Sequence, residues 1–509
     1  MRSTFHSLEV ARRGLTTQQT ALQVTGHNIA NANTPGFSRQ RVNFVQTEPY
    51  PPASMNRPQI PGQLGTGVQA GSIQRVRESF LDIQFRGENN KHGYWSVKAD
   101  ALAKMEEILN EPSDTGLSKT LDRFWQSFQD LAVNPTNTGA RSVVRQRGIA
   151  VAETFNYLSD SLKSIQQDFK NEIDVTTKQI NSLATRINNI NQQIGSVEPH
   201  GLLPNDLYDE RDRLVDELSQ LVNIKVTPVK SGGNALEIAE GRYTIELVDN
   251  KGIAIPFAGK LVDGQANKVN ELKVKYDETT KLVSEISIGG VSLEADQFRS
   301  NGKFKGLIES FGYMDGTSEK GTYPGMLKAL DTMAFDFVAE FNRVHNEMWS
   351  ISSMEAGEHT AYNFFAPIDV REGAAKSIKL DDAIMDSLNN IATSSNGNLG
   401  DGRGAIALAE VKNNTLSIGG STTTIQNFYE SLVGAMAVEA QEANRLKHNS
   451  DTLRLSVDQR RQSVSSVSLD EEMTNMIQFQ HAYNASARMI TVTDEILDRI
   501  INGMGLVGR

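Results

Sequence analysis

The sequence predicts a mainly α-helical, elongated, multi-domain protein with a β-rich insert, whose two terminal helices pair antiparallel. Three observations lead to this fold class. Apolar residues recur every seven positions near both ends of the chain. A proline-free stretch, 139–195, shows helical periodicity, and apolar residues mostly alternate with polar ones over 226–300. A length of 509 residues suggests about three domains.

The N-terminal segment is predicted to be a helix with a narrow apolar seam. The seam residues lie one heptad apart: Leu8, Leu15, Leu22 and Ile29. A seam this thin cannot bury itself, so the helix needs a partner surface. We expect the helix to end within 31–36, because Pro35 disfavours helical angles at Thr34 and Gly36 allows a turn.

The middle of the chain alternates between extended and helical segments. Residues 37–80 contain many prolines and are expected to be extended, and helical periodicity returns near Tyr94. A helix over 139–195 would be about 80 Å long. Asn205 or Asp206 is predicted to cap a further helix, and another is expected over 325–347.

Two long helices, 425–467 and 469–504, are predicted to close the chain. The last one carries a second heptad seam, which Gln480 and Asp494 interrupt. Its residues are Leu469, Met473, Met476, Tyr483, Ala487, Ile490, Leu497, Ile501 and Met504. If the terminal helices pair within one molecule, they pair antiparallel, and unpaired seam residues would then face neighbouring subunits.

This pattern predicts three domains. The terminal helical assembly domain comprises 1–36 and 469–509. A long-helix bundle comprises 37–225, 301–350 and 405–468. A β-rich outer insert comprises 226–300 and 351–404.

Composition excludes several classes of protein. A net charge of −11 argues against a nucleic-acid partner, which needs a basic surface. The chain has no cysteine, which excludes disulfides, thiol catalysis and cysteine metal sites. Neither a transmembrane helix nor a cleaved secretory signal is expected, because long apolar runs are missing. Aromatic residues make up 7%, which favours packing of small aliphatic side chains between helices over a bulky core.

The sequence predicts no catalytic residue, cofactor or metal ligand. None of the eight histidines has ligand spacing, and His345 and His481 are interpreted as packing or surface residues. The sequence leaves open that two carboxylates meet by chance in a cleft. Arg75 and Arg77 are interpreted as solvated or as ion-pair partners. The three acids 470–472 are interpreted as first-turn acids of a helix that Ser468 caps.

Two segments resemble the flagellar rod, hook and hook-associated axial proteins. The assembly signature contains Asn28, Ile29, Ala30, Asn31, Thr34, Pro35, Gly36 and Phe37. Residues 469–488 resemble the matching C-terminal helix of that family. Residues 205–218, the long helix and the chain length are similar to the hook-associated protein 1 branch. The resemblance is weakest in 226–300 and 350–400.

The resemblance implies a structural subunit at the hook–filament junction of the bacterial flagellum, which self-assembles into a tubular ring. Its implied partners are copies of itself, the hook protein on one side, a second junction protein and the filament on the other, and an export chaperone. It implies extracellular secretion through the flagellar type III apparatus, with terminal segments poorly ordered in the free monomer. Alternatives are another axial protein of hook or rod type, a coiled-coil adhesin or scaffold, and an enzyme carried by the insert.

Overall fold

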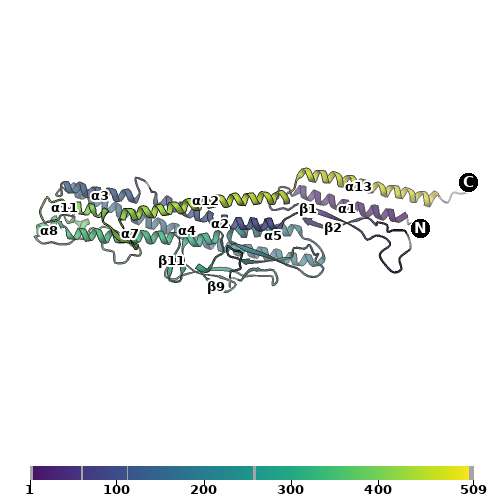
Figure 1. The fold of residues 1–509 in the computed structure, drawn as a ribbon, viewed down its shortest axis with the longest axis horizontal. Helices are drawn as coiled ribbons and strands as arrows, with labels where there is room; N and C mark the ends of the chain where they lie inside the picture. Colours follow the sequence, from purple (N-terminus) through teal and green to yellow (C-terminus); the bar gives the residue numbers. More distant parts are fainter. Residues whose placement is uncertain (1–3, 59–60, 112, 256–258, 504–509) are drawn as a thin grey trace.

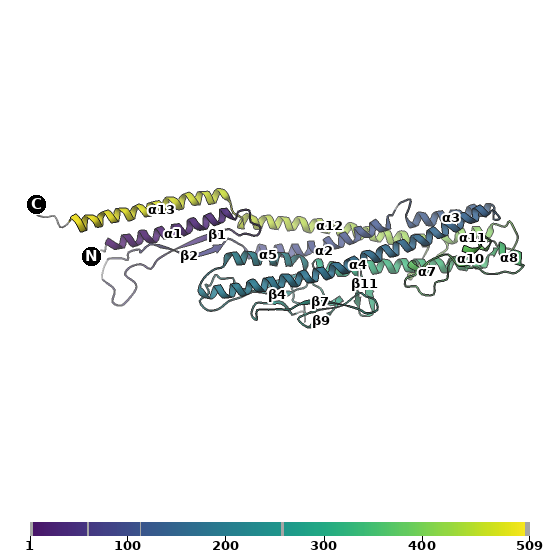
Figure 2. The same cartoon turned by 180° about the vertical axis from the view of Figure 1, so that it is seen from behind.

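The computed structural model describes residues 4–58, 61–111, 113–255 and 259–503. The molecule is elongated, and both chain ends lie at the same end of it (Figures 1 and 2). The elongated architecture, the long helices and the β-rich part confirm the predicted fold class. Within the described residues, no helix combines the length and apolar character that a membrane span requires.

The terminal helices α1 (Thr4–Ala30) and α13 (Leu469–Asp498) lie side by side and antiparallel, as predicted (Figures 1 and 2). A π-helical turn, Arg499–Gly503, follows α13. The hairpin of β1 (Gln40–Gln46) and β2 (Val68–Arg75) packs on α1, where Thr17 Oγ1 donates to the Val68 carbonyl over 3.1 Å. The buried side chains of α1 are small or polar: Ala11, Thr17, Ala21, Thr25 and Asn28.

Six helices form the shaft of the molecule. They are α2 (Ser79–Leu109), α3 (Leu117–Val133), α4 (Thr138–Val197), α5 (Asn205–Leu221), α7 (Thr322–Glu347) and α12 (Ile425–Ser465). The α4 helix has 60 residues and is therefore about 90 Å long. It begins where the Asn137 side chain accepts from the Ala140 N–H, and it buries residues at spacings of three and four, such as Phe155, Leu158 and Leu162.

Two small sheets lie along one side of the shaft (Figure 1). The first has the antiparallel order β3-β4-β5-β6: β3 (Ile224–Val229), β4 (Arg242–Leu247), β5 (Lys260–Asp263) and β6 (Lys268–Val269). The second has the order β11-β10-β8-β7, with β9 on β8: β7 (Leu272–Tyr276), β8 (Val283–Ile288), β9 (Val291–Glu294), β10 (Tyr313–Asp315) and β11 (Ser318–Lys320). Helix α6 (Lys303–Phe311) precedes β10.

Asparagine side chains attach these sheets to α4. The Asn181 amide donates to the Leu272 carbonyl and accepts from the Leu272 N–H, both over 2.8 Å. Asn191 makes the same pair of bonds with Tyr243. We call this arrangement, in which one asparagine binds the N–H and C=O of one residue, a main-chain clamp. Asn342 forms another with Phe365.

The end of the shaft far from the termini is capped by short elements. They are β12 (Trp349–Ser350), α8 (Ile351–Ala356), α9 (Ala374–Ser377), α10 (Asp382–Asp386), β13 (Ala392–Ser394), α11 (Arg403–Glu410), β14 (Leu416–Ile418) and β15 (Ser421–Thr423). Single 3₁₀ turns lie at Glu198–His200, Ala295–Gln297, Leu388–Asn390 and Val411–Asn413. Residues 351–404, which were predicted to belong to the β-rich insert, pack here on α3, α4 and α7, away from the two sheets.

An aromatic cluster fills this far end, against the expectation of a core without bulky residues. Its members are Phe124, Trp125, Phe128, Phe337, Phe341, Phe364 and Phe365, and none is more than 3% exposed. Ring centroids lie 5.2 Å apart for Phe124 and Phe341 and again for Phe337 and Phe365. A low aromatic fraction did not prevent a bulky core, because these residues gather in one place.

Two predicted helix starts differ from the structure. Helix α2 begins at Ser79, well before Tyr94. Its first half was not predicted because polar side chains such as Arg86 and Asn89 take up much of its buried face and weaken the apolar periodicity. Pro204 occupies the cap position of α5, with no side-chain cap bond. The Asn205 amide donates instead to the Ile73 carbonyl, over 2.9 Å.

Candidate assembly site

The predicted seam of the terminal pair is only partly covered within one molecule. In α1, Leu8, Leu15, Leu22 and Ile29 are all half-buried. In α13 the middle seam residues are half-buried: Met476, Tyr483, Ala487, Ile490 and Leu497. The ends of that seam are open, with Leu469 51%, Met473 53% and Ile501 73% exposed. Met504 lies outside the described residues.

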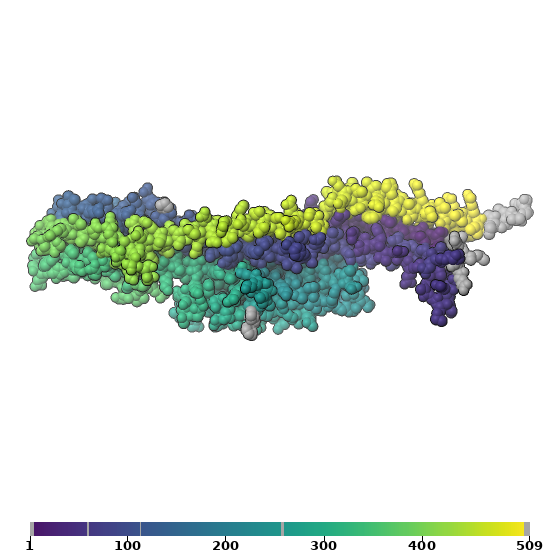
Figure 3. All heavy atoms as spheres, in the orientation of Figure 1, coloured from purple at the N-terminus to yellow at the C-terminus, as the bar shows by residue number. Residues whose placement is uncertain are grey.

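A further set of apolar side chains on α13 faces away from α1. Ile477, Met489, Val492 and Ile496 are each about half exposed. The C-terminal helices run along the surface of the molecule for most of its length (Figure 3). A helix that exposes apolar residues in this way is typical of a protein–protein contact surface.

Helices α1 and α13 approach closely at a glycine. A Cβ added to Gly14 would lie 3.1 Å from Ser486 Oγ and 3.9 Å from Ser486 Cβ. Phe479, one heptad earlier on α13, contacts Phe44 of the hairpin edge-on, with 5.9 Å between ring centroids. The hairpin and α1 together therefore form the surface on which α13 lies.

The predicted signature residues form the last turn of α1 and the turn that follows it. Asn28 is buried, Ile29, Asn31 and Phe37 are half-buried, and Ala30, Thr34, Pro35 and Gly36 are exposed. The Asn31 amide donates to the His27 carbonyl over 3.0 Å, and the Phe37 ring lies edge-on to His27. Gly36 has a φ of +83°, which a side chain would disfavour. A groove of about 570 Å³ separates this turn from α5 and α12.

Asn28 and Glu472 connect the two terminal helices through polar contacts. Asn28 forms a main-chain clamp on Gln40, with distances of 2.8 and 2.9 Å. Its amide nitrogen also lies 3.2 Å from Glu472 Oε2. Arg39 Nε donates to Glu472 Oε1 over 2.7 Å, and the Arg39 N–H donates to the Ser465 carbonyl at the end of α12 over 2.9 Å. We call Asn28, Arg39, Gln40 and Glu472 the Glu472 site.

A buried ion-pair network joins the hairpin to the shaft. It contains Arg75, Arg77, Arg86, Arg211 and Arg461 and the acids Asp82, Asp209, Asp212, Asp216 and Glu240. Asp212 lies 2.9 Å from Arg75, 3.4 Å from Arg77 and 3.1 Å from Arg86. Burial alone would raise the pKa of Asp212, but these three guanidinium groups outweigh it and hold that pKa well below its usual range.

Arg461 extends the network to α12. It pairs with Asp216 and lies face-on to Phe85 of α2, 4.0 Å from the ring centroid. Burial raises the pKa of Asp209, and Arg75 and the Ser38 N–H offset this only in part. Since the network contacts the hairpin, α2, α5 and α12, it fixes the terminal pair to the shaft.

Sequence reasoning identified part of this site. Arg75 and Arg77 are ion-pair partners, one of the two roles considered for them. Asp209, Asp212 and Asp216 were missed, although their i, i+3, i+7 spacing places them on one helix face. Glu472 was interpreted as a first-turn acid; Ser468 does cap α13, but the Glu472 side chain is 3% exposed and ion-paired.

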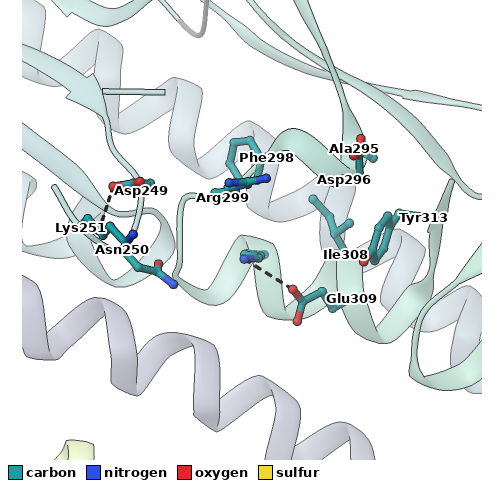
Figure 4. A pocket seen from close by; sticks show the side chains of 11 residues that line it. Asp249, Asn250, Lys251, Ala295, Asp296, Phe298, Arg299, Ile308, Glu309 and Tyr313 are labelled. Atoms are coloured by element: carbon teal, nitrogen blue, oxygen red, sulfur yellow. Dashed lines mark hydrogen bonds and ion pairs between the residues drawn. The ribbon is translucent and has the colours of Figure 1, made fainter. Parts of the chain in front are cut away.

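A charged hollow of about 370 Å³ lies beside the second sheet (Figure 4). Asp249, Asp296, Arg299 and Glu309 line it, and Lys305 pairs with Glu309 over 3.6 Å. Its lining, which the structure describes in full, has no histidine or serine that could form a nucleophile–base pair. In the described ranges, no group of three or more His, Asp or Glu side chains could hold a metal ion.

Comparison with known proteins decides the family. Residues 102–360 match the family model of the flagellar hook-associated protein FlgK helical domain. Over its full length, the chain is 49% identical to flagellar hook-associated protein 1 of Bacillus subtilis (strain 168), which is also covered in full. The chain belongs to the flagellar hook-associated protein 1 (FlgK) family.

Other matches agree with this assignment. Flagellar hook-associated protein 1 of Salmonella typhimurium is 25% identical over 97% of this chain and 98% of that protein. The solved flagellar hook junction protein FlgK of Burkholderia pseudomallei shares the fold, with a TM-score of 0.60 and 15% identity over 75% of this chain and all of that one. The prediction of a structural hook–filament junction protein of the flagellum is thereby confirmed.

The two ends of this FlgK-family chain match models of a wider group. Residues 8–37 match the flagella basal body rod protein model, and 458–503 match the flagellar basal body rod FlgEFG protein C-terminal model. These ranges contain the signature turn and α13. As a component of the flagellum, the chain assembles with other flagellar components.

Proposed function

We propose that this chain forms the hook–filament junction by assembling through its terminal helix pair into a tubular ring. The observation that carries the proposal is the half-exposed apolar surface of α13, which one molecule leaves uncovered. A second copy of the chain is the partner that covers it. The predicted seam residues that are half-buried would complete their packing in the same step.

The proposed neighbours are the hook protein on one side and the second junction protein and filament on the other. Membership of the FlgK family and the rod-protein matches at both ends support these partners. We further propose that an export chaperone accompanies the chain, and that the chain leaves the cell through the flagellar export apparatus without a cleaved signal.

We propose a purely structural role, without catalysis. The charged groups of the ion-pair network pair with one another and join the hairpin, α2 and α5, which supports a structural role. We also propose a division into a terminal part, a helical shaft with the aromatic far end, and a sheet part over 224–294 and 313–320. Family membership and the placement of the elements support it.

Truncation tests the proposal. Chains lacking 1–35 or 470–509 are expected to keep the shaft folded, because its aromatic cluster and α4 packing lie elsewhere. Such chains should not restore filament attachment in a strain that lacks the gene. Restored attachment by either truncated chain, at the level of the full chain, would contradict the proposed role of the terminal pair.

A further inference from the structure

The most buried side chain of α13 is a carboxylate. Among the described residues of this helix, Glu472 and Thr493 are the buried ones, with 2% and 5% of the whole residue exposed. Burying a carboxylate is unfavourable unless charged or hydrogen-bonding partners surround it. Glu472 has such partners in Arg39 and Asn28, which belong to the opposite end of the chain.

Apolar packing alone does not determine which face of α13 contacts α1. The face toward α1 carries Met476, Tyr483 and Ile490, which are half-buried. Ile477, Val492 and Ile496 lie on other faces and are half-exposed. Because apolar side chains surround the helix, a rotated α13 could bury a similar apolar area.

We propose that Glu472 is a positioning residue, which selects the face of α13 that turns toward α1. Its contacts with Arg39 and Asn28 exist in one rotational setting, since a rotation of α13 moves the carboxylate away from both. A single polar group in an otherwise apolar helix contact can specify one arrangement among several of similar stability. The selected setting leaves the second apolar face outward for a neighbouring copy; this last step rests on the proposed function.

The neighbouring residue Glu471 defines one alternative rotation of α13 that can be tested. It lies beside Glu472, already contacts Arg39 Nη1 over 2.5 Å, and its side chain is 61% exposed. A rotation of about 100°, the angle between successive helix residues, would bring Glu471 to the place of Glu472 and the shorter Asp470 to the place of Glu471. Arg39 would then have one glutamate partner, whereas the native setting gives it two. The same rotation would bring Ala485 to the place of Ser486, opposite Gly14.

Cysteine cross-linking tests this in the full chain, which has no cysteine of its own. The pair Gly14→Cys/Ser486→Cys reports the native setting, because the two Cβ positions are 3.9 Å apart, within the range of about 3.5–4.5 Å for disulfides. The pair Gly14→Cys/Ala485→Cys reports the rotated setting. Each pair is placed in three backgrounds: unchanged, Glu472→Leu, and the matched control Glu471→Leu.

We expect the native pair to dominate in the unchanged and Glu471→Leu chains. In the Glu472→Leu chain, the ratio of rotated to native disulfide should rise several-fold, because either setting then gives Arg39 the same single glutamate, Glu471, and the native setting loses its advantage. Circular dichroism of each reduced chain verifies that helix content is retained.

Three results would overturn the inference: an unchanged ratio in the Glu472→Leu chain, an equal change in the Glu471→Leu chain, or no native disulfide in the unchanged background. The experiment involves one chain and no other subunit. It therefore fails or succeeds independently of the truncation test of assembly.

Discussion

Arg75, the last residue of β2, and Asp212, in the middle of α5, lie 2.9 Å apart, and both side chains are only 3% exposed. The pair joins the hairpin under the terminal helices to the shaft. A buried pair of this kind contributes little if both partners are replaced by apolar residues, but removing one partner leaves the other charge uncompensated. The joint between the two parts of the molecule is therefore sensitive to single substitutions.

Asp212→Asn is expected to destabilise the full chain by about 3–5 kcal/mol, because Arg75, Arg77 and Arg86 would lose their shared carboxylate. Urea unfolding measures the loss. Glu210→Gln on the same helix is the control, since its pair with Arg213 is about 40% exposed and should contribute less than about 1 kcal/mol. Equal effects of the two substitutions would contradict the importance of the network.

Phe124→Ala is expected to cost about 3–5 kcal/mol, because its ring is fully buried in the aromatic cluster and its removal leaves a cavity. Fluorescence of the adjacent Trp125 during denaturation follows the loss. Phe80→Ala is the matched control, since that ring is 64% exposed. The control should change stability by no more than about 0.5 kcal/mol.

The shaft should lose stability in acid through His345. The Ala392 N–H donates to its Nε2 over 2.9 Å, its Nδ1 lies 2.6 Å from the Tyr362 carbonyl, and burial lowers the pKa of the imidazole from 6.5 to about 4. The neutral ring thus fits the folded state, whereas the unfolded chain takes up a proton below pH 6.5. The contribution of His345 to the free energy of unfolding is complete above pH 6.5. It falls by about 3 kcal/mol as the pH drops toward 4.

Unfolding free energies at several pH values, for the natural chain and His345→Gln, measure this contribution. The substitution lowers stability at pH 8 but should flatten the slope between pH 6.5 and 4. Parallel pH profiles for the two chains would show that His345 does not carry the effect.

Ile477→Ser together with Ile496→Ser should leave the fold intact and impair assembly. Both side chains are about half exposed in the single molecule, so their loss should change its stability by about 0.5 kcal/mol or less. Filament attachment in a strain that lacks the gene is the measurement. Gln478→Ser with Glu495→Ser, on the exposed side of the same helix, is the control and should restore attachment.

Sequence patterns predicted the helices well wherever apolar residues set the packing. The regular spacing through Phe155, Leu158 and Leu162 predicted α4. The heptads predicted the two terminal helices, and chain topology predicted that they pair antiparallel. The first half of α2 was missed because its buried face places the polar residues Arg86, Asn89 and Asn90 after only two large apolar ones, Leu81 and Phe85. Apolar periodicity does not predict a helix that packs mainly through hydrogen bonds of polar side chains.

Contacts between residues far apart in the sequence could not be predicted from local patterns. Arg39 and Glu472 are 433 positions apart in the sequence, so their spacing predicts no contact. A glutamate in a first helical turn is ordinarily solvated. The aromatic cluster draws on 124–128, 337–341 and 364–365, which composition cannot bring together.

The main-chain clamps have a consequence for how this protein tolerates sequence divergence. Asn181 and Asn191 hold the two sheets through the N–H and C=O groups of Leu272 and Tyr243, which every residue except proline possesses. These hydrogen bonds do not depend on which side chain the strand residue carries. The attachment itself can accordingly survive the exchange of residue 243 or 272 for any residue except proline, so long as the two asparagines persist.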